Sequence, residues 1–180
     1  MQQNATSRKR VSRKWRFLLP QIRWVDKADG QMRYMLDTCA VIHLMTDYQS
    51  LSKNIHHIFE SYDTQLHISS ESIKELIIAY RSKGLWHKKW KKELDIIHSV
   101  ANDFQIEILP VGKHEMQTYA NLHINLAEDH RDPSDHIIIS HAITNRMPLI
   151  SCDRKFHFYT RQGLDLITYW TILHMDWQPP

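Results

Sequence analysis

Two acidic residues stand just after apolar runs that are typical of buried strands. Asp37 directly follows the apolar residues 34–36, and Asp153 follows residues 148–151 with one residue between. Because parallel strands end at the same edge of a sheet, we expect these two carboxylates to lie close together. Two acids of predicted helices can join them, Asp135 from the first turn of its helix and Glu75 from one turn into another.

Clustered carboxylates of this kind are suited to binding a divalent cation. Carboxylates a few ångström apart repel one another, and a cation relieves the repulsion. Mg²⁺ and Mn²⁺ prefer oxygen ligands, and such an ion can activate water against a phosphodiester. We therefore predict a Mg²⁺ or Mn²⁺ site, with catalysis of phosphodiester hydrolysis, at four acids: Asp37, Glu75, Asp135 and Asp153.

Each of these acids also has an ordinary structural explanation. Asp37 could cap a helix, and Asp135 could interact with a helix dipole at position N3. Asp153 could begin a loop, and Glu75 could complete a capping box with Ser72. Only the joint pattern, with several carboxylates at one edge of a sheet, favours a functional site.

Strand-like and helix-like segments alternate along the chain. Short apolar runs predict strands at residues 34–36, 66–68, 106–109, 148–151 and 164–167. Helical spacing of apolar residues predicts helices that begin at Thr38, Ser69 or Ser70, and Asp132, and further helices at 50–62, 86–102 and 113–129. Strands separated by helices imply an α/β fold, with a parallel sheet covered on both faces.

The motifs that carry the acids resemble those of PIN domains, and among these most closely the VapC-type toxins of bacterial toxin–antitoxin modules. The resemblance covers about residues 33–167. It rests on Leu36-Asp37-Thr38, on Glu75 within a helix, on the stretch from His130 to Ala142, and on the stretch from Met147 to Phe156. It implies a three-layer α/β/α fold with a central, mainly parallel sheet of four to five strands.

Position by position, the resemblance places the family's acids on the same four residues, with Glu71 as the alternative to Glu75. Asp132 matches a position that does not bind metal, and we assign it to the helix cap. Cys39 stands where these toxins commonly have Asn. The hydroxyls that match positions supporting the acids belong to Thr38 and Ser151.

The function that the resemblance implies is a metal-dependent endoribonuclease that cleaves RNA with metal-activated water. It would be the toxin of a type II pair, inhibited by a small antitoxin protein, and would form a homodimer. Two alternatives stay open: a PIN-fold module that binds nucleic acid or protein without cleavage, and a nuclease that acts in RNA maturation or on DNA.

Composition and charge are compatible with a nucleic-acid partner. The chain has 180 residues and a formal net charge of +3. We predict a basic extension at 1–32, a nuclease domain at 33–170 and a tail at 171–180. Arg154 and Lys155, beside Asp153, are the best candidates for RNA phosphate contacts. Basic residues also gather within 8–23 and among the lysines of 88–92. Trp86 and Trp90, which are interleaved with these lysines, we assign to the core.

Other chemistries are poorly supported. The thirteen histidines and two cysteines form no zinc motif, and no glycine-rich nucleotide loop is present. Cys39 also replaces the second Asp that an aspartyl-phosphate enzyme needs. We expect the cysteines to be buried, and His130 and His136 are candidates for substrate phosphate contact. With two cysteines and no long apolar segment, we expect a cytoplasmic protein without a membrane partner.

Overall fold

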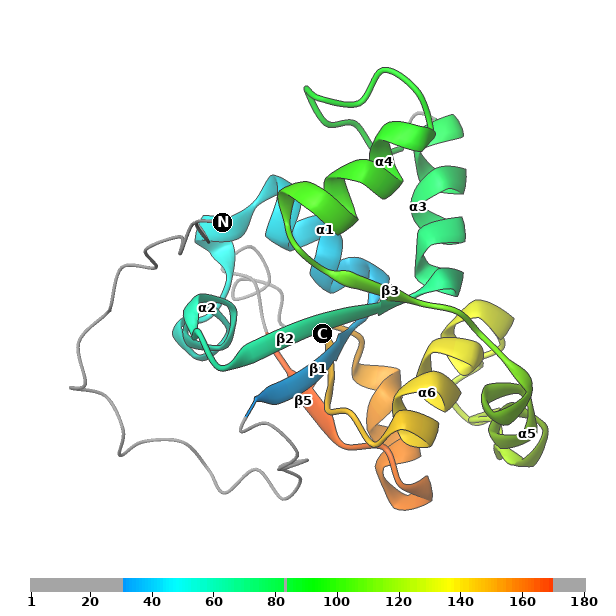
Figure 1. Cartoon of the computed structure of the whole chain (residues 1–180). Helices are drawn as coiled ribbons and strands as arrows, with labels where there is room; N and C mark the ends of the chain where they lie inside the picture. Colours follow the sequence, from blue (N-terminus) through cyan, green and yellow to red (C-terminus); the bar gives the residue numbers. More distant parts are fainter. Residues whose placement is uncertain (1–30, 83, 170–180) are drawn as a thin grey trace, which may run out of the picture.

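The computed structural model describes residues 31–82 and 84–169 (Figure 1). Five parallel strands form one sheet in the order β3-β2-β1-β4-β5. Their bounds are β1 Met32–Leu36, β2 Thr64–Ser69, β3 Glu107–Leu109, β4 Leu149–Ser151 and β5 Leu166–Thr168. The predicted α/β fold with a parallel sheet is confirmed.

Alternation along the strands divides the core into two layers. On β1, Tyr34 and Leu36 face one side of the sheet and Met35 faces the other, as period-2 side-chain geometry requires. The first side is covered by α1 (Thr38–Thr46), α2 (Lys53–Glu60), α3 (Ser70–Arg81) and α4 (Leu94–His98). The second is covered by α6 (Pro133–Asn145) and the 3₁₀ segment η3 (Arg154–Gln162), with α5 (Lys113–Asn121) packed on α6.

The helix predicted at 86–102 is wrong in its first half. In the structure α4 begins only at Leu94 and continues into a π-helical turn, η2 (Ser99–Asp103). Elsewhere in the chain, a short 3₁₀ turn, η1 (Tyr48–Ser50), precedes α2. The side chain of Asp95 accepts hydrogen bonds from the backbone N–H groups of Lys91 (2.8 Å) and Lys92 (3.1 Å). Such local bonds compete with helical ones and set the helix start later.

The two tryptophans of this segment have different surroundings. Trp90 is 4% exposed, and its indole N–H donates to Ser99 Oγ at 3.0 Å. Trp86 is 70% exposed. The assignment of both tryptophans to the core is therefore right for Trp90 and wrong for Trp86, because residues 86–90 do not lie on one face of a helix.

The helix predicted at 113–129 is also too long, since α5 ends at Asn121. The side chain of Gln162 forms two hydrogen bonds with the backbone of His123: the His123 N–H donates to Oε1 (2.8 Å), and Nε2 donates to the His123 carbonyl (2.9 Å). These bonds use the groups that would have continued the helix. By contrast, the helix that we predicted to begin at Asp132-Pro133 is confirmed: it is α6, and Asp132 is its N-cap.

Two sequence predictions lie largely outside the described residues, namely the tail at 171–180 and the extension at 1–32, of which only residues 31 and 32 are described. The domain boundaries stay predictions. Within the described part of the chain, every helix is too short or too polar to cross a lipid bilayer.

Candidate functional site

The carboxyl ends of β1 and β4 meet as predicted, and Asp37 lies where they meet. Its backbone N–H donates to the Ile150 carbonyl (3.0 Å), which continues the strand pairing by one residue. Its carboxylate accepts from the Thr38 backbone N–H at Oδ1 (2.6 Å) and from Ser151 Oγ at Oδ2 (2.7 Å). Asp37 thus caps α1, which is the ordinary structural role that we had considered for it, and it also faces the end of the neighbouring strand.

Glu75 reaches this edge from the second turn of α3. The helix begins at Ser70, and Ser69 is the N-cap, so Glu75 lies too far along to form the capping box considered with Ser72. The hydroxyl of Thr38 donates to the Glu75 carboxylate. Glu71, the alternative to Glu75, instead forms an ion pair with Lys74.

The start of α6 brings two further acids to the same place. Ligand atoms of Glu75, Asp132 and Asp135 lie within 4.8 Å of one another, and so do those of His130, Asp135 and Asp153. Asp135 belongs to both groups. Asp132 accepts a hydrogen bond from the Ser134 N–H (2.8 Å), as a helix cap should, yet it also lies in the cluster, which the sequence prediction did not include.

Burial and mutual repulsion change the acidity of the cluster. Burial, together with Asp37 and the other nearby acids, raises the pKa of Asp135 to about 7. Burial also raises the pKa of Glu75 to about 7, opposed by the hydrogen bond from Thr38. Burial raises the pKa of Asp37 as well, against its three hydrogen bonds and with a smaller contribution from Asp153.

This donor set fits a hard divalent cation. Within each of the two groups the ligand atoms are close enough to share one, whereas Asp37 belongs to neither group. Burial, followed by repulsion from neighbouring acids, raises the pKa values of Glu75 and Asp135, and a bound cation would favour their charged forms. Oxygen donors of this kind suit Mg²⁺ and Mn²⁺. A cation would replace the protons that the cluster otherwise holds near neutral pH.

The histidines next to Asp135 point inward. They are therefore not available for the substrate phosphate contact for which we had named them as candidates. His130 is 2% exposed, and its Nε2 lies 2.9 Å from Asp135 Oδ2. His136 is buried too, and its Nε2 donates to the His130 carbonyl (3.1 Å). Burial lowers the pKa of both rings. The sequence held one signal of this arrangement, a histidine five residues before the acid in a helix-start motif.

The two cysteines are half-buried and not fully buried as predicted, and Cys39 takes part in the polar contacts of the site. Its thiol donates to Asp37 Oδ2 (3.2 Å), and its sulfur accepts from the Cys152 backbone N–H (3.3 Å). Cys39 therefore provides a polar contact at the position where the resemblance predicts Asn.

The predicted phosphate-binding residues begin η3. Asp153 caps this segment by accepting from the Lys155 backbone N–H (2.8 Å). The side chain of Arg154 is exposed and that of Lys155 is half-buried. Both cations therefore follow an acid of the cluster directly in the chain and lie at its margin.

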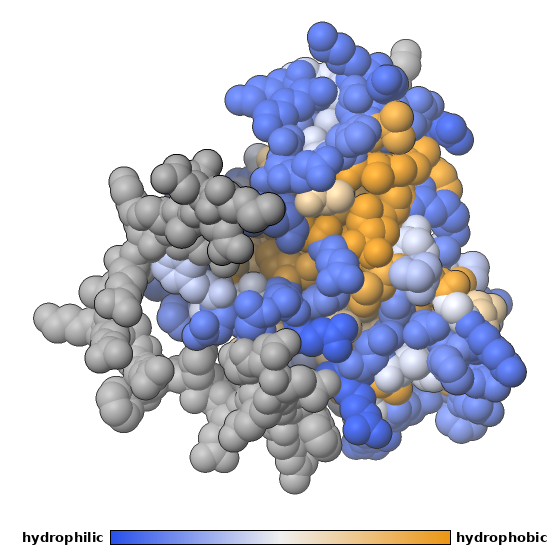
Figure 2. Space-filling model, in the orientation of Figure 1, coloured by the Kyte–Doolittle hydropathy of each residue, from blue (hydrophilic) through white to orange (hydrophobic). Residues whose placement is uncertain are grey.

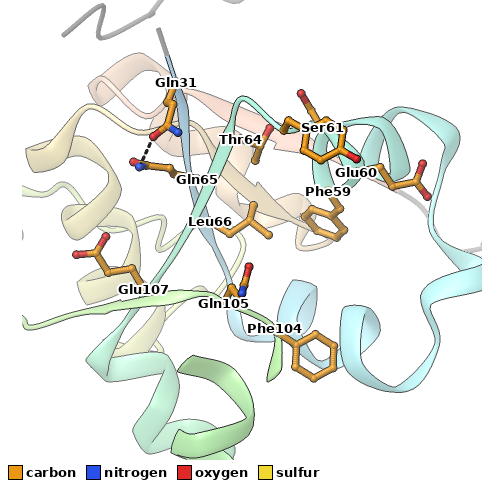
Figure 3. A pocket seen from close by; sticks show the side chains of 11 residues that line it. Gln31, Phe59, Glu60, Ser61, Thr64, Gln65, Leu66, Phe104, Gln105 and Glu107 are labelled. Atoms are coloured by element: carbon orange, nitrogen blue, oxygen red, sulfur yellow. Dashed lines mark hydrogen bonds between the residues drawn. The ribbon is translucent and has the colours of Figure 1, made fainter. Parts of the chain in front are cut away.

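A cavity of about 1070 Å³ lies at the other end of the sheet (Figure 3). It is lined by the first residues of β2, including Leu66, by aromatic side chains such as Phe59 and Phe104, and by the acids Glu60 and Glu107. The residues of the described ranges that line it include no arginine or lysine. None of the four predicted site acids borders this cavity.

The parallel sheet with acids gathered at its carboxyl edge defines the class of this protein as an α/β protein with a strand-end acidic site. Comparison with family profiles matches the PIN domain over residues 34–161, and the chain belongs to this family. The resemblance that we had identified from the motifs is confirmed. A comparison with curated proteins gave no match.

Solved structures show the same fold. VapBC2 from Rickettsia felis, bound to a DNA fragment from its promoter, aligns with a TM-score of 0.58 at 21% identity, over 77% of this chain and 100% of that one. VapBC-1 from nontypeable Haemophilus influenzae gives 0.56 at 21% identity, over 76% and 98%. DNA-bound VapBC from Salmonella typhimurium gives 0.54 at 19% identity, over 77% and 98%.

Proposed function

We propose that this protein is a Mg²⁺- or Mn²⁺-dependent endoribonuclease. The observation that carries the proposal is the convergence, at one sheet edge, of four carboxylates from four separate chain segments: Asp37, Glu75, Asp135 and Asp153. Repulsion between clustered carboxylates destabilises a fold unless a bound cation relieves it. Membership of the PIN family supports a nuclease, and the resemblance to VapC toxins supports RNA as the substrate.

In this proposal the acids hold the ion, and the neighbouring hydroxyls orient the acids. Asp135, which belongs to both ligand groups, would be shared between Glu75 and Asp132 on one side and Asp153 on the other. A bound ion would activate a water molecule and stabilise the charge that develops on the phosphate. Ser151 fixes one oxygen of Asp37, and the Thr38 hydroxyl does the same for Glu75.

The substrate would lie along the margin of the cluster. Arg154 and Lys155 are placed there by η3, and their charges can pair with RNA phosphates on either side of the scissile bond. Phosphate contacts of this kind position a nucleic acid without selecting a sequence. The structure thus supports RNA binding beside Asp153, at the carboxyl edge of the sheet.

As partner we propose a small antitoxin protein, with the nuclease acting as a toxin and forming a homodimer. Solved structures of similar fold include those of VapBC, which supports a protein partner. Figure 2 shows apolar surface exposed beside α3 and α4, where Ile78 and Leu94 are about half exposed. A surface of this kind is suited to covering by an apolar helix of such a partner.

The test is cleavage mapping on total cellular RNA, with the full chain, in Mn²⁺ and in EDTA. We expect discrete cuts that require the metal and are absent with Asp135→Asn, whose amide keeps the size of the side chain. Glu107→Gln, at the opposite end of the sheet, is the control and should cut normally. Equal cleavage in EDTA, or by Asp135→Asn, would contradict the proposal. Cleavage of a single-stranded DNA substrate in place of RNA would favour the alternative of a nuclease that acts on DNA.

A further inference from the structure

A buried chain of three polar side chains leads from η3 to the acidic cluster. Tyr159 is 0% exposed, and its hydroxyl lies 2.9 Å from His130 Nδ1. The other ring nitrogen of His130 lies 2.9 Å from Asp135 Oδ2. Asp135 is the acid shared by both candidate ligand groups, so this chain ends on the carboxylate on which the proposed site depends most.

The direction of the hydrogen bonds follows from the ionised form in which Asp135 would bind a cation, because a carboxylate oxygen can only accept. The Tyr159 oxygen already accepts from the Asn125 backbone N–H (3.3 Å), and the hydroxyl has one proton to donate. The acceptor found for that proton is His130 Nδ1. The ring proton of neutral His130 then resides on Nε2 and is donated to Asp135 Oδ2.

The position of His130 is restrained on several sides. Its backbone N–H donates to the Asn125 carbonyl (3.0 Å), and its carbonyl accepts from His136 Nε2. Its ring packs against Phe156 and Tyr159, with centroids 5.6 and 5.5 Å apart. A donor restrained in this way can hold a carboxylate in one rotamer.

We propose that His130, oriented by Tyr159, is a positioning residue for Asp135. It occupies Oδ2 with an N–H donor, so Oδ1 would be the oxygen available to a cation. This role rests on the proposed function, because it matters only if Asp135 binds a metal ion. Outer hydrogen bonds of this kind typically change metal affinity by about 10–100-fold when they are removed.

The experiment measures Mn²⁺ affinity by calorimetry, together with the thermal midpoint, for full-length variants. For His130→Leu we expect about 10–100-fold weaker Mn²⁺ binding. His130→Gln keeps an N–H donor at a similar reach and should recover most of the affinity. For Tyr159→Phe, which frees the imidazole tautomer, we expect a loss of about several-fold.

Matched controls separate positioning from packing. His141→Leu removes another buried histidine, whose partner is Ser69 Oγ (3.0 Å), and Tyr34→Phe removes another buried phenol hydroxyl. Both should lower the thermal midpoint about as much as the test variants do and leave Mn²⁺ affinity unchanged.

Three results would overturn the positioning role. The first is wild-type affinity in His130→Leu, and the second is an equal loss in His130→Gln and His130→Leu. The third is a nitrogen coupling in the pulsed EPR spectrum of the Mn²⁺ complex that disappears in His130→Leu, which would make His130 a ligand. If the wild-type protein binds no Mn²⁺, the proposed function itself fails. If the wild-type protein binds Mn²⁺ and cleaves RNA, and the His130 variants bind Mn²⁺ as tightly as it does, only the positioning role fails.

Discussion

The two ends of the parallel sheet differ in what they concentrate. The carboxyl end concentrates charge, with half-buried or buried acids such as Asp37 and Asp135 in a packed environment. The amino end concentrates open space, the cavity beside Leu66, whose acids Glu60 and Glu107 are exposed. A concave surface and a reactive arrangement of groups are thus separated in this molecule, and the acids rather than the cavity identify the candidate site.

The difference has a cause in the topology. In a parallel α/β sheet, each helix begins where a strand ends, so helix N-termini gather at the carboxyl edge. The helices α1 and α6 are capped here by Asp37 and Asp132, and α3 by Ser69. Their free N–H groups and dipoles favour negative charge. The structural role of these acids as caps and their proposed role as ligands therefore go together: Asp37 caps with Oδ1 while Oδ2 bonds to Ser151.

The largest effect should come from exchanging an acid for its amide at each end of the sheet. For Asp37→Asn we expect at least about 100-fold slower RNA cleavage, because a metal ligand contributes several kcal/mol to the transition state. The thermal midpoint should change little, because Asn also caps helices well. The control is Glu107→Gln, and equal losses in the two variants would remove the distinction between the ends.

Metal should stabilise the protein through the carboxyl end alone. At a Mn²⁺ concentration of 100 times the dissociation constant, the gain in unfolding free energy should be about 2.7 kcal/mol. Because the pKa values of Glu75 and Asp135 are about 7, protons compete with the metal, and the gain should be larger at pH 8 than at pH 5.5. Thermal melts check this, and a gain that Asp135→Asn retains would speak against the site.

Without metal, the cluster should cost stability at alkaline pH. The folded-state pKa values of Glu75 and Asp135, about 7, exceed their ordinary values of 4.5 and 3.8, so the folded state binds more protons between about pH 4 and 7. Their contribution is therefore favourable at low pH and is lost as the pH rises through 7.

Because buried histidines titrate in the opposite sense, the measurement is a difference between two proteins. In EDTA, the double variant Glu75→Gln/Asp135→Asn should match the wild type in urea unfolding at pH 5 and exceed it at pH 8. The single variant Asp63→Asn, at an exposed acid just before β2, should give no such difference. If the double variant is less stable than the wild type at pH 8, the prediction is wrong, because groups within the fold then stabilise the ionised carboxylates.

The smallest effect should be on the salt dependence of RNA binding. In a catalytically inactive Asp135→Asn background, replacing Arg154 and Lys155 by Ala should weaken the binding of RNA to the protein. It should also lower the slope of log affinity against log salt by about 1 for each RNA phosphate that is no longer neutralised. The matched control replaces Lys91 and Lys92, two exposed lysines of the irregular segment before α4. An equal change in slope in the control would place RNA elsewhere on the surface.

The alternation of strands and helices could be predicted because it depends on local sequence. Asp132-Pro133 sets the start of α6, and apolar runs set β1 and β4. Parallel topology then places Asp37 at the same edge as Asp153 without any knowledge of side-chain packing. The predicted cluster of acids therefore followed from order and spacing along the chain.

What local sequence could not determine depended on contacts between distant residues. The end of α5 is set by Gln162, and the inward orientation of His130 is set by Tyr159, each about thirty or more residues away in the chain. The polar environment of Asp37 likewise depends on Ser151, 114 residues later. Spacing along the chain contains no information about such pairs.

The sequence by itself thus determined that acids gather at one edge of the sheet, because helix caps and strand ends are local features that a parallel sheet brings to one edge. Only the tertiary structure decided how those acids are held. It showed that Asp132 joins the cluster, that Glu71 is paired with Lys74, and that a buried histidine bonds to Asp135. The physical reason is that hydrogen bonds and burial are properties of neighbours in space, and these set both the orientation and the pKa of each carboxylate.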